Sequence, residues 1–144
     1  ELFGRLILEI NQAGLSWITV LKKQVNIKKA FSNFNINKIA NYDEKDRLRL
    51  LNDKGIIRNK LKINAVIYNA QKIITIQKEY GSFHKWLSNF SSNNLSEWII
   101  LFKQNFKFTG GEITKEFLMS IGIIKGAHIP SCPIYIKQEK LKSL

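Results

Sequence analysis

Apolar residues recur at helical spacing from the start of the chain. The first stripe predicts a helix that fades at Ala13–Gly14, and its residues are Leu2, Phe3, Leu6, Ile7 and Ile10. Ser16 is a fair N-cap for a second helix. We expect this second helix to end at Lys22 and Lys23, because cations suit a helix C-terminus.

Two shorter helices are predicted in the following segment. Asn26 is expected to cap one of them, which would hold Ala30 and Phe31. Asp43 is expected to cap the other, whose apolar residues are Leu48 and Leu51.

The longest apolar stripe predicts a helix over about residues 58–80, ended by Gly81, with a face of Ile63, Ile67, Ala70 and Ile74. Further helices are predicted at about 83–90 and 95–103, and their core aromatic residues are Trp86 and Trp98. A last helix is expected over about 112–121, closed by Gly122. Because sustained period-two alternation is lacking, the pattern predicts one compact all-α domain over residues 1–144, a helical bundle.

Composition changes this picture mainly through charge. Hydrophobic residues make up 44% of the chain, which favours a folded globule. Lys and Arg number 23 against 11 acidic residues, and the net charge of +12 favours a polyanionic partner, most commonly nucleic acid. The alternative is a Lys-rich surface that merely accompanies a biased Asn, Ile and Lys usage.

The cysteine count and the absence of long apolar runs bear on where in the cell the protein is expected. One Cys excludes an internal disulfide. No leader-like segment and no apolar run of about 20 residues is present, so we expect a soluble intracellular protein without membrane contact. The chain begins within an apolar helical pattern and without Met, so we expect its natural start to lie further upstream.

Residues 9–23 carry the most informative chemistry. Glu9 provides a carboxylate and Trp17 an aromatic plane, separated by a polar turn that contains Gly14. This combination suits a pocket for a flat, polar, electron-poor ring. Taken in isolation, a surface carboxylate and an ordinary core indole are the better interpretations of these two residues.

The segment 106–112 predicts a tight hairpin between two helices, because Gly and the preceding Asn105 tolerate positive φ. Successive N–H groups at a Gly-rich turn that opens a helix form an anion site, where Lys107 or Lys103 would add charge to hold a DNA phosphate. The alternative is a plain connector in which Thr109 and Glu112 form a capping box.

His128 and Cys132 are spaced like two ligands of a tetrahedral zinc site. By themselves they provide half of such a site, and coincidence is the more common explanation of one His near one Cys.

Several blocks of the chain resemble the 3-methyladenine DNA glycosylase I family in the same order. The blocks are residues 12–23, residues 55–58 with Lys62-Ile63, residues 106–110, and Gly122 followed by His128 and Cys132. The resemblance implies the all-α fold of the helix-hairpin-helix superfamily, with DNA and base sites between helical lobes. Residues 102–122 would then supply the hairpin that binds the DNA backbone.

The same resemblance implies roles for individual residues. Glu9 would be catalytic and would contact the polar edge of an expelled 3-methyladenine, while Trp17 would stack on its face. Gln12, Gly14 and Leu15 would form the loop that enters the duplex and fills the gap left by the flipped nucleotide.

The remaining implied roles concern the backbone grip and a metal. The DNA-binding hairpin residues would be Lys107, Thr109 and Gly110. His128 and Cys132 would be two of four ligands of a structural zinc, with a further Cys and His in a segment that precedes Glu1.

The implied activity is hydrolytic excision of 3-methyladenine by a monofunctional glycosylase, acting as a monomer on double-stranded alkylated DNA in a bacterial-type cytoplasm, associated with the nucleoid. No motif places a Lys for Schiff-base chemistry, and residues 125–127 lack the Asp that many superfamily relatives have there.

The chain departs from the family pattern at Ile10, Asn11, Asn105, Gly111 and Glu112. A non-catalytic helix-hairpin-helix DNA-binding module and a helical RNA-binding or scaffold protein are the alternatives.

Overall fold

The computed structural model describes residues 2–12 and 15–124, apart from the side chain of Trp17. Within these residues every regular element is helical, which confirms the predicted all-α class. The elements in chain order are α1 (Leu2–Gln12), α2 (Trp17–Ala30), the 3₁₀ turn η1 (Ser32–Phe34), α3 (Ile36–Ala40), α4 (Glu44–Leu51), α5 (Lys60–Tyr80), α6 (Phe83–Asn89), α7 (Leu95–Asn105) and α8 (Gly111–Ser120).

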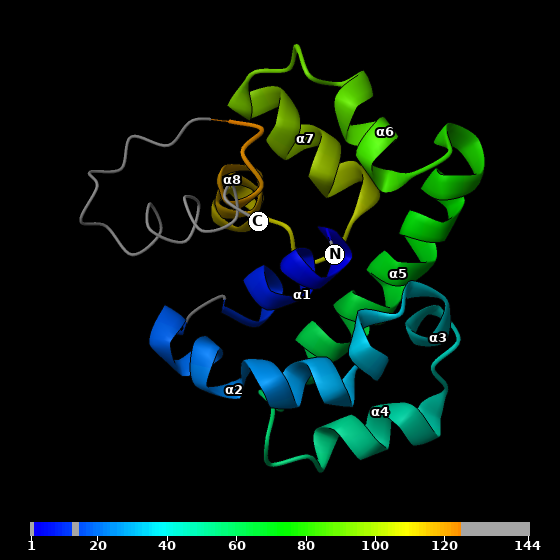
Figure 1. The fold of residues 1–144 in the computed structure, drawn as a ribbon, viewed down its shortest axis with the longest axis vertical. Coiled ribbons are helices and arrows are strands. Elements are labelled where there is room, and N and C mark those ends of the chain that lie inside the picture. Colours follow the sequence, from blue (N-terminus) through cyan, green and yellow to red (C-terminus); the bar gives the residue numbers. More distant parts are fainter. Residues whose placement is uncertain (1, 13–14, 125–144) are drawn as a thin grey trace.

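Helix α1 lies at the centre of the molecule. It packs against α2, α5 and α8. Figure 1 shows α6 and α7 at one end, α2 and α4 at the other, and α1 between them. In the described part of the chain, no helix is long and apolar enough to cross a membrane.

Side-chain caps set the helix starts where the sequence predicts them. The Ser16 hydroxyl accepts a hydrogen bond from the Thr19 N–H at the start of α2. Asp43 forms a reciprocal capping box with Asp46 at α4, and hydrogen bonding to the Asp46 N–H lowers the Asp43 pKa below its usual value. Because these caps are local, the sequence alone is sufficient to locate them.

The predicted end of α2 is wrong. The helix continues through Lys22, Lys23 and Asn26 to Ala30, so no separate helix begins at Asn26. Lys is a good helix former, and Ile27 extends the buried stripe of Val20 by two further turns. Packing of this stripe outweighs the weak stop that the Lys pair provides.

The sequence pattern did not predict η1 and α3. Ser32, Asn33 and Phe34 all have positive φ, from 55° to 61°, in a connection where no glycine marks the turn. Gly4 permits this packing, since a Cβ there would lie 2.6 Å from the Phe34 ring. Asn35 then caps α3 through the Lys38 N–H.

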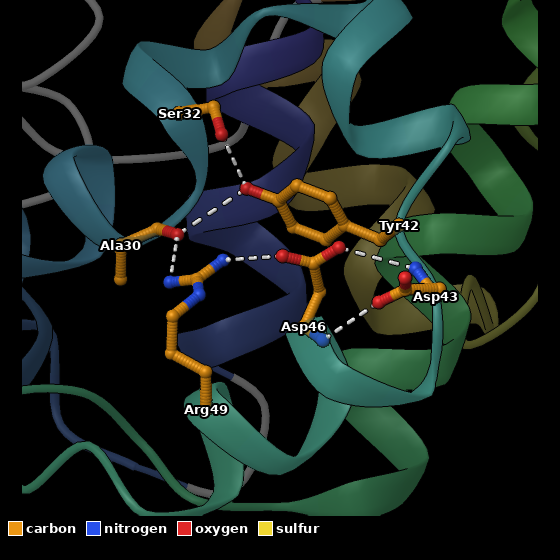
Figure 2. A network of polar contacts seen from close by, with 6 residues as sticks. All are labelled: Ala30, Ser32, Tyr42, Asp43, Asp46 and Arg49. Carbon is orange, nitrogen blue, oxygen red and sulfur yellow. Dashed lines mark hydrogen bonds and ion pairs between the residues drawn. The ribbon is translucent and has the colours of Figure 1, made fainter.

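A polar network fastens this turn to α4, as Figure 2 shows. The Tyr42 hydroxyl lies 3.3 Å from the Ala30 carbonyl oxygen, to which it donates, and 2.6 Å from the Ser32 hydroxyl. Arg49 Nη1 donates to the same Ala30 oxygen at 2.9 Å. The last carbonyl group of α2, that of Ala30, thereby gains two partners that its own helix cannot supply.

Trp86 and Trp98 are core residues, as predicted, with exposed fractions of 3% and 0%. They belong to an aromatic cluster under α7 and α8, whose other members are Phe83, Phe90, Phe102, Phe106 and Phe117. Aromatic rings of this kind contribute large buried areas and specific packing geometry. The cluster forms a rigid support for the connection between α7 and α8.

Candidate functional site

Glu9 is buried in the last turns of α1, with 2% of its surface exposed. The alternative of a surface carboxylate is therefore wrong. Burial of a carboxylate is costly unless polar partners compensate, so such a residue is rarely retained for packing alone. Its position three residues before the end of α1 places it beside the turn that leads to α2.

A backbone hydrogen bond spans the end of α1. Gln12 is the last residue of the helix, and its carbonyl oxygen accepts a hydrogen bond from the Leu15 N–H at 2.7 Å. Leu15 is 40% exposed although it is a large apolar residue. An exposed Leu six positions after a buried carboxylate could insert between DNA bases.

Two members of the predicted site lie wholly or partly outside the described residues. Gly14 is one of them. The backbone of Trp17 begins α2, but its side chain lies outside the described part. The roles of both residues therefore stay predictions.

The structure accounts for the two departures from the family pattern in α1. Ile10 and Asn11 are buried, with exposed fractions of 1% and 3%. The Asn11 side-chain amide donates to the Ile7 carbonyl oxygen at 2.8 Å. Both side chains are therefore part of the packing of α1 and are not exposed to a ligand.

Lys62 belongs to one of the blocks that carry the family resemblance, but the sequence indicated no role for it. Its Nζ donates to the Asn11 carbonyl oxygen at 3.1 Å and lies 6.0 Å from the centre of the Phe108 ring. Burial lowers the Lys62 pKa below its ordinary value of 10.5. A buried cation at the C-terminal end of α1 interacts favourably with the helix dipole, and here it connects α1 and α5 with the α7–α8 hairpin.

The predicted hairpin is confirmed between α7 and α8, but the residue with positive φ is different. Phe108 has a φ of 59°, whereas Asn105 is the last residue of α7 and Gly110 has a φ of −65°. The exposed Lys107 precedes Phe108, and its Nζ lies 4.4 Å from the centre of the Tyr68 ring.

Asn69 of α5 fixes this hairpin from below. Its side-chain amide donates to the Lys107 carbonyl oxygen at 2.9 Å and accepts from the Lys107 N–H at 2.8 Å. Asn69 has no exposed surface. A buried Asn on the apolar face of a long helix was the signal available in the sequence.

The alternative of a Thr109–Glu112 capping box is wrong. Thr109 is buried, and its hydroxyl donates to the Phe102 carbonyl oxygen at 3.2 Å. The N-cap of α8 is Gly110, which supplies no side-chain hydrogen bond. Glu112 lies exposed in the first turn of the helix. Thr109 can therefore contribute to a DNA contact only through its backbone.

The N-terminus of α8 is open to a ligand. The first N–H groups of any helix lack partners within the helix, and here no side chain caps them. A Cβ on Gly110 would meet nothing within 4 Å, so the protein's own packing does not require glycine there. An oxyanion that approaches these N–H groups would account for the missing side chain.

The proposed metal ligands His128 and Cys132 lie outside the described residues. Among residues 2–12 and 15–124 no cluster of three or more His, Cys, Asp or Glu side chains is placed to hold a metal ion. A structural zinc therefore stays a prediction from sequence.

Comparison with known proteins identifies the family. Residues 1–99 match the methyladenine glycosylase family. DNA-3-methyladenine glycosylase 1 of Escherichia coli (strain K12) is 34% identical over 94% of this chain and 82% of its own length. DNA-3-methyladenine glycosylase of Haemophilus influenzae is 30% identical over 92% of this chain and 82% of its own length.

Solved structures agree with the sequence comparison. The 3-methyladenine DNA glycosylase I of Staphylococcus aureus has a TM-score of 0.80 and 31% identity, over 93% of this chain and 81% of its own. A crystal structure of a 3-methyladenine DNA glycosylase I variant in complex with 3-methyladenine has a TM-score of 0.81 and 31% identity, over 93% of this chain and 82% of its own. The chain described here therefore belongs to the methyladenine glycosylase family.

Proposed function

We propose that this protein is a monofunctional DNA glycosylase that hydrolyses the N-glycosidic bond of 3-methyladenine in alkylated double-stranded DNA. Relatives 30% and 34% identical over most of the chain are named for this activity. The observation that supports the proposal within the structure is the burial of Glu9 in α1, six residues before the exposed Leu15. These two features suit a pocket for a flipped base and a side chain that fills the gap in the duplex.

The chemistry requires few groups. N3-methylation gives the adenine of the nucleotide a positive charge, so the bond between N9 and the sugar C1′ is already weak. When this bond breaks, its electron pair leaves with the base, which departs neutral, while a water oxygen adds to C1′ and releases a proton to solvent. A carboxylate at Glu9 would accept hydrogen bonds from the exocyclic amine and select bases that carry a donor there.

The rest of the site binds DNA. Flipping the nucleotide costs a few kcal/mol, which contacts to the duplex must offset. We assign Gln12, Gly14 and Leu15 to the loop that enters the duplex, and Trp17 to the stacking face. The uncapped N-terminus of α8 at Gly110, with Lys107 beside it, would bind a backbone phosphate in the manner of a helix-hairpin-helix motif.

We also propose that His128 and Cys132 are two ligands of a structural zinc. Thiolate and imidazole are the ligand types that tetrahedral zinc prefers. The zinc content of the purified protein, compared with that of Cys132→Ser, tests this assignment independently of activity.

The test of the function is release of free 3-methyladenine from alkylated DNA. Glu9→Gln removes the negative charge at nearly constant volume, and loss of a charge-assisted hydrogen bond of about 1.5–3 kcal/mol predicts a decrease in kcat/KM of roughly 10- to 150-fold. Trp17→Ala should also decrease release. Glu79→Gln makes the same chemical change at an exposed position of α5 and should leave the rate unchanged.

Two outcomes would contradict these assignments. Wild-type release by Glu9→Gln and Trp17→Ala would remove both residues from the site. DNA binding without any release by the wild-type protein would indicate a non-catalytic DNA-binding module instead.

A further inference from the structure

A groove of about 500 Å³ lies between α4 and the first half of α5. Its polar lining includes Glu44, Arg47, Lys60, Asn64, Tyr68 and Lys107. Helices α4 and α5 pack against each other, and the chain joins them through residues 52–59. The α7–α8 hairpin contributes Lys107 to the lining, so one end of the groove adjoins the hairpin.

The lining is mainly cationic. Arg47, Lys60 and Lys107 contribute three positive charges to the lining, and Glu44 contributes the single negative charge. The Arg47 Nε donates to the Asn64 side-chain oxygen at 3.0 Å, which orients the guanidinium group. The two outer guanidinium nitrogens carry four further N–H donors that can bind an oxyanion.

Tyr68 gives the groove an aromatic wall on the hairpin side. The Lys107 ammonium lies 4.4 Å from the centre of the Tyr68 ring, a cation–π contact at a residue that is 37% exposed. Asn69, the next residue of α5, holds the Lys107 backbone through two hydrogen bonds. Adjacent residues of α5, Tyr68 and Asn69, therefore form this end of the groove and also hold the hairpin in place.

The dimensions match a stretch of nucleic-acid backbone. Residues 60–68 of α5 span about 12 Å along the helix axis at about 1.5 Å per residue. One strand of B-form DNA carries a phosphate for about every 3.4 Å of axis, so a groove of this length spans more than one phosphate. A single small anion would need only one end of such a groove.

We propose that this groove is a second phosphate-binding surface, which receives the DNA backbone that runs on from the α7–α8 hairpin. This inference rests on the proposed function, because DNA must bind the hairpin for its backbone to reach the groove. Lys60 and Arg47 bind phosphates, Lys107 bridges the two surfaces, and Glu44 weakens the attraction at the start of α4.

The test is the salt dependence of binding to a short undamaged DNA duplex, on which excision does not interfere. The slope of log K against log salt is negative. The double variant Lys60→Gln/Arg47→Gln should reduce its magnitude by about 0.9 for each phosphate that it no longer neutralises, or about 1.8 in total. Glu44→Gln should act in the opposite direction and tighten binding about two- to threefold, as expected for removal of one like charge near a phosphate.

A matched control is available at the other end of α5 and on α6. Lys78 and Lys85 are exposed, and Lys78 lies about 27 Å along α5 from Lys60. Lys78→Gln/Lys85→Gln also removes two positive charges, yet it should leave the slope unchanged. An equal decrease of slope in both double variants, or an unchanged slope in Lys60→Gln/Arg47→Gln, would overturn the groove as a phosphate site.

Two further results separate this inference from the proposed function. If the protein releases 3-methyladenine but the groove variants keep the wild-type slope, the groove assignment fails and the function stands. If the slope falls as expected but no base is released, the groove stands and the function fails. Tighter binding of single-stranded RNA than of duplex DNA by the groove would also overturn the proposal.

Discussion

At the scale of single residues, stability and DNA binding should separate at Gly110. Its φ of −65° is accessible to any residue, and a Cβ there would meet nothing within 4 Å. Gly110→Ala should therefore lower the free energy of unfolding by no more than about 1 kcal/mol, the cost of a poorer N-cap residue. The added methyl group would lie beside the open N–H groups of α8, so DNA binding should weaken several-fold.

Thermal unfolding and a DNA titration of the same Gly110→Ala sample measure the two effects. Gly4→Ala is the useful contrast, because its Cβ would lie 2.6 Å from the Phe34 ring and should lower stability. If Gly110→Ala bound DNA as tightly as the wild-type protein, the phosphate would have to lie elsewhere.

The sequence singled out Glu9 but not the long-range contacts of Lys62 and Asn69. Glu9 stands next to a recognisable block, and its burial agrees with a site residue. Lys62 and Asn69 make their key contacts with residues 51 and 38 positions away in the chain. No local pattern encodes such pairs, because the arrangement of α1, α5 and the hairpin in space decides them.

At the scale of elements, the hairpin depends on a single side chain of α5. Asn69→Leu keeps a similar volume but leaves the Lys107 N–H and C=O without their partner. We expect a decrease of about 2–3 kcal/mol in the free energy of unfolding, since buried polar groups without partners are costly. Backbone amides at residues 106–110 should also exchange faster with solvent, and DNA binding should weaken.

Chemical denaturation and hydrogen exchange test this expectation. Asn52→Leu is the control, because Asn52 is exposed and its side chain bonds only the Leu48 carbonyl oxygen of its own helix among the contacts described. That change should cost less than about 0.5 kcal/mol. Unchanged exchange at residues 106–110 in Asn69→Leu would show that the aromatic cluster alone holds the hairpin.

Helix starts were predictable from the sequence and helix ends were less so. Ser16 and Asp43 cap through side chains within three residues of the helix start. The end of α2 instead depends on burial of Ile27, and the turn at Ser32–Phe34 on space beside Gly4. Both depend on tertiary packing, which outweighs local propensity.

At the scale of the whole molecule, the periodicity predicted the class but not the arrangement. A stripe such as that of α1 identifies a buried face without identifying its partner. In the structure α1 packs against α8, about a hundred residues further along the chain. That contact brings the Glu9 helix and the α7–α8 hairpin together, so the proposed site exists only in the folded molecule.

The net charge of +12 affects folding and binding in opposite directions. Like charges repel each other in the compact state, while an exposed ion pair such as Arg49–Asp46 contributes little.

Raising the salt concentration from about 50 to 200 mM should therefore raise the Tm of the free protein by a few degrees, because repulsion is screened. The same change should weaken DNA binding by about 10³-fold or more if six or more phosphates are contacted. Thermal unfolding and DNA titrations in NaCl and KCl would measure both responses, and agreement between the two salts would identify screening as the cause. A Tm that fell with salt would mean that attractive pairs outweigh the repulsion and that the positive charge is already compensated within the fold.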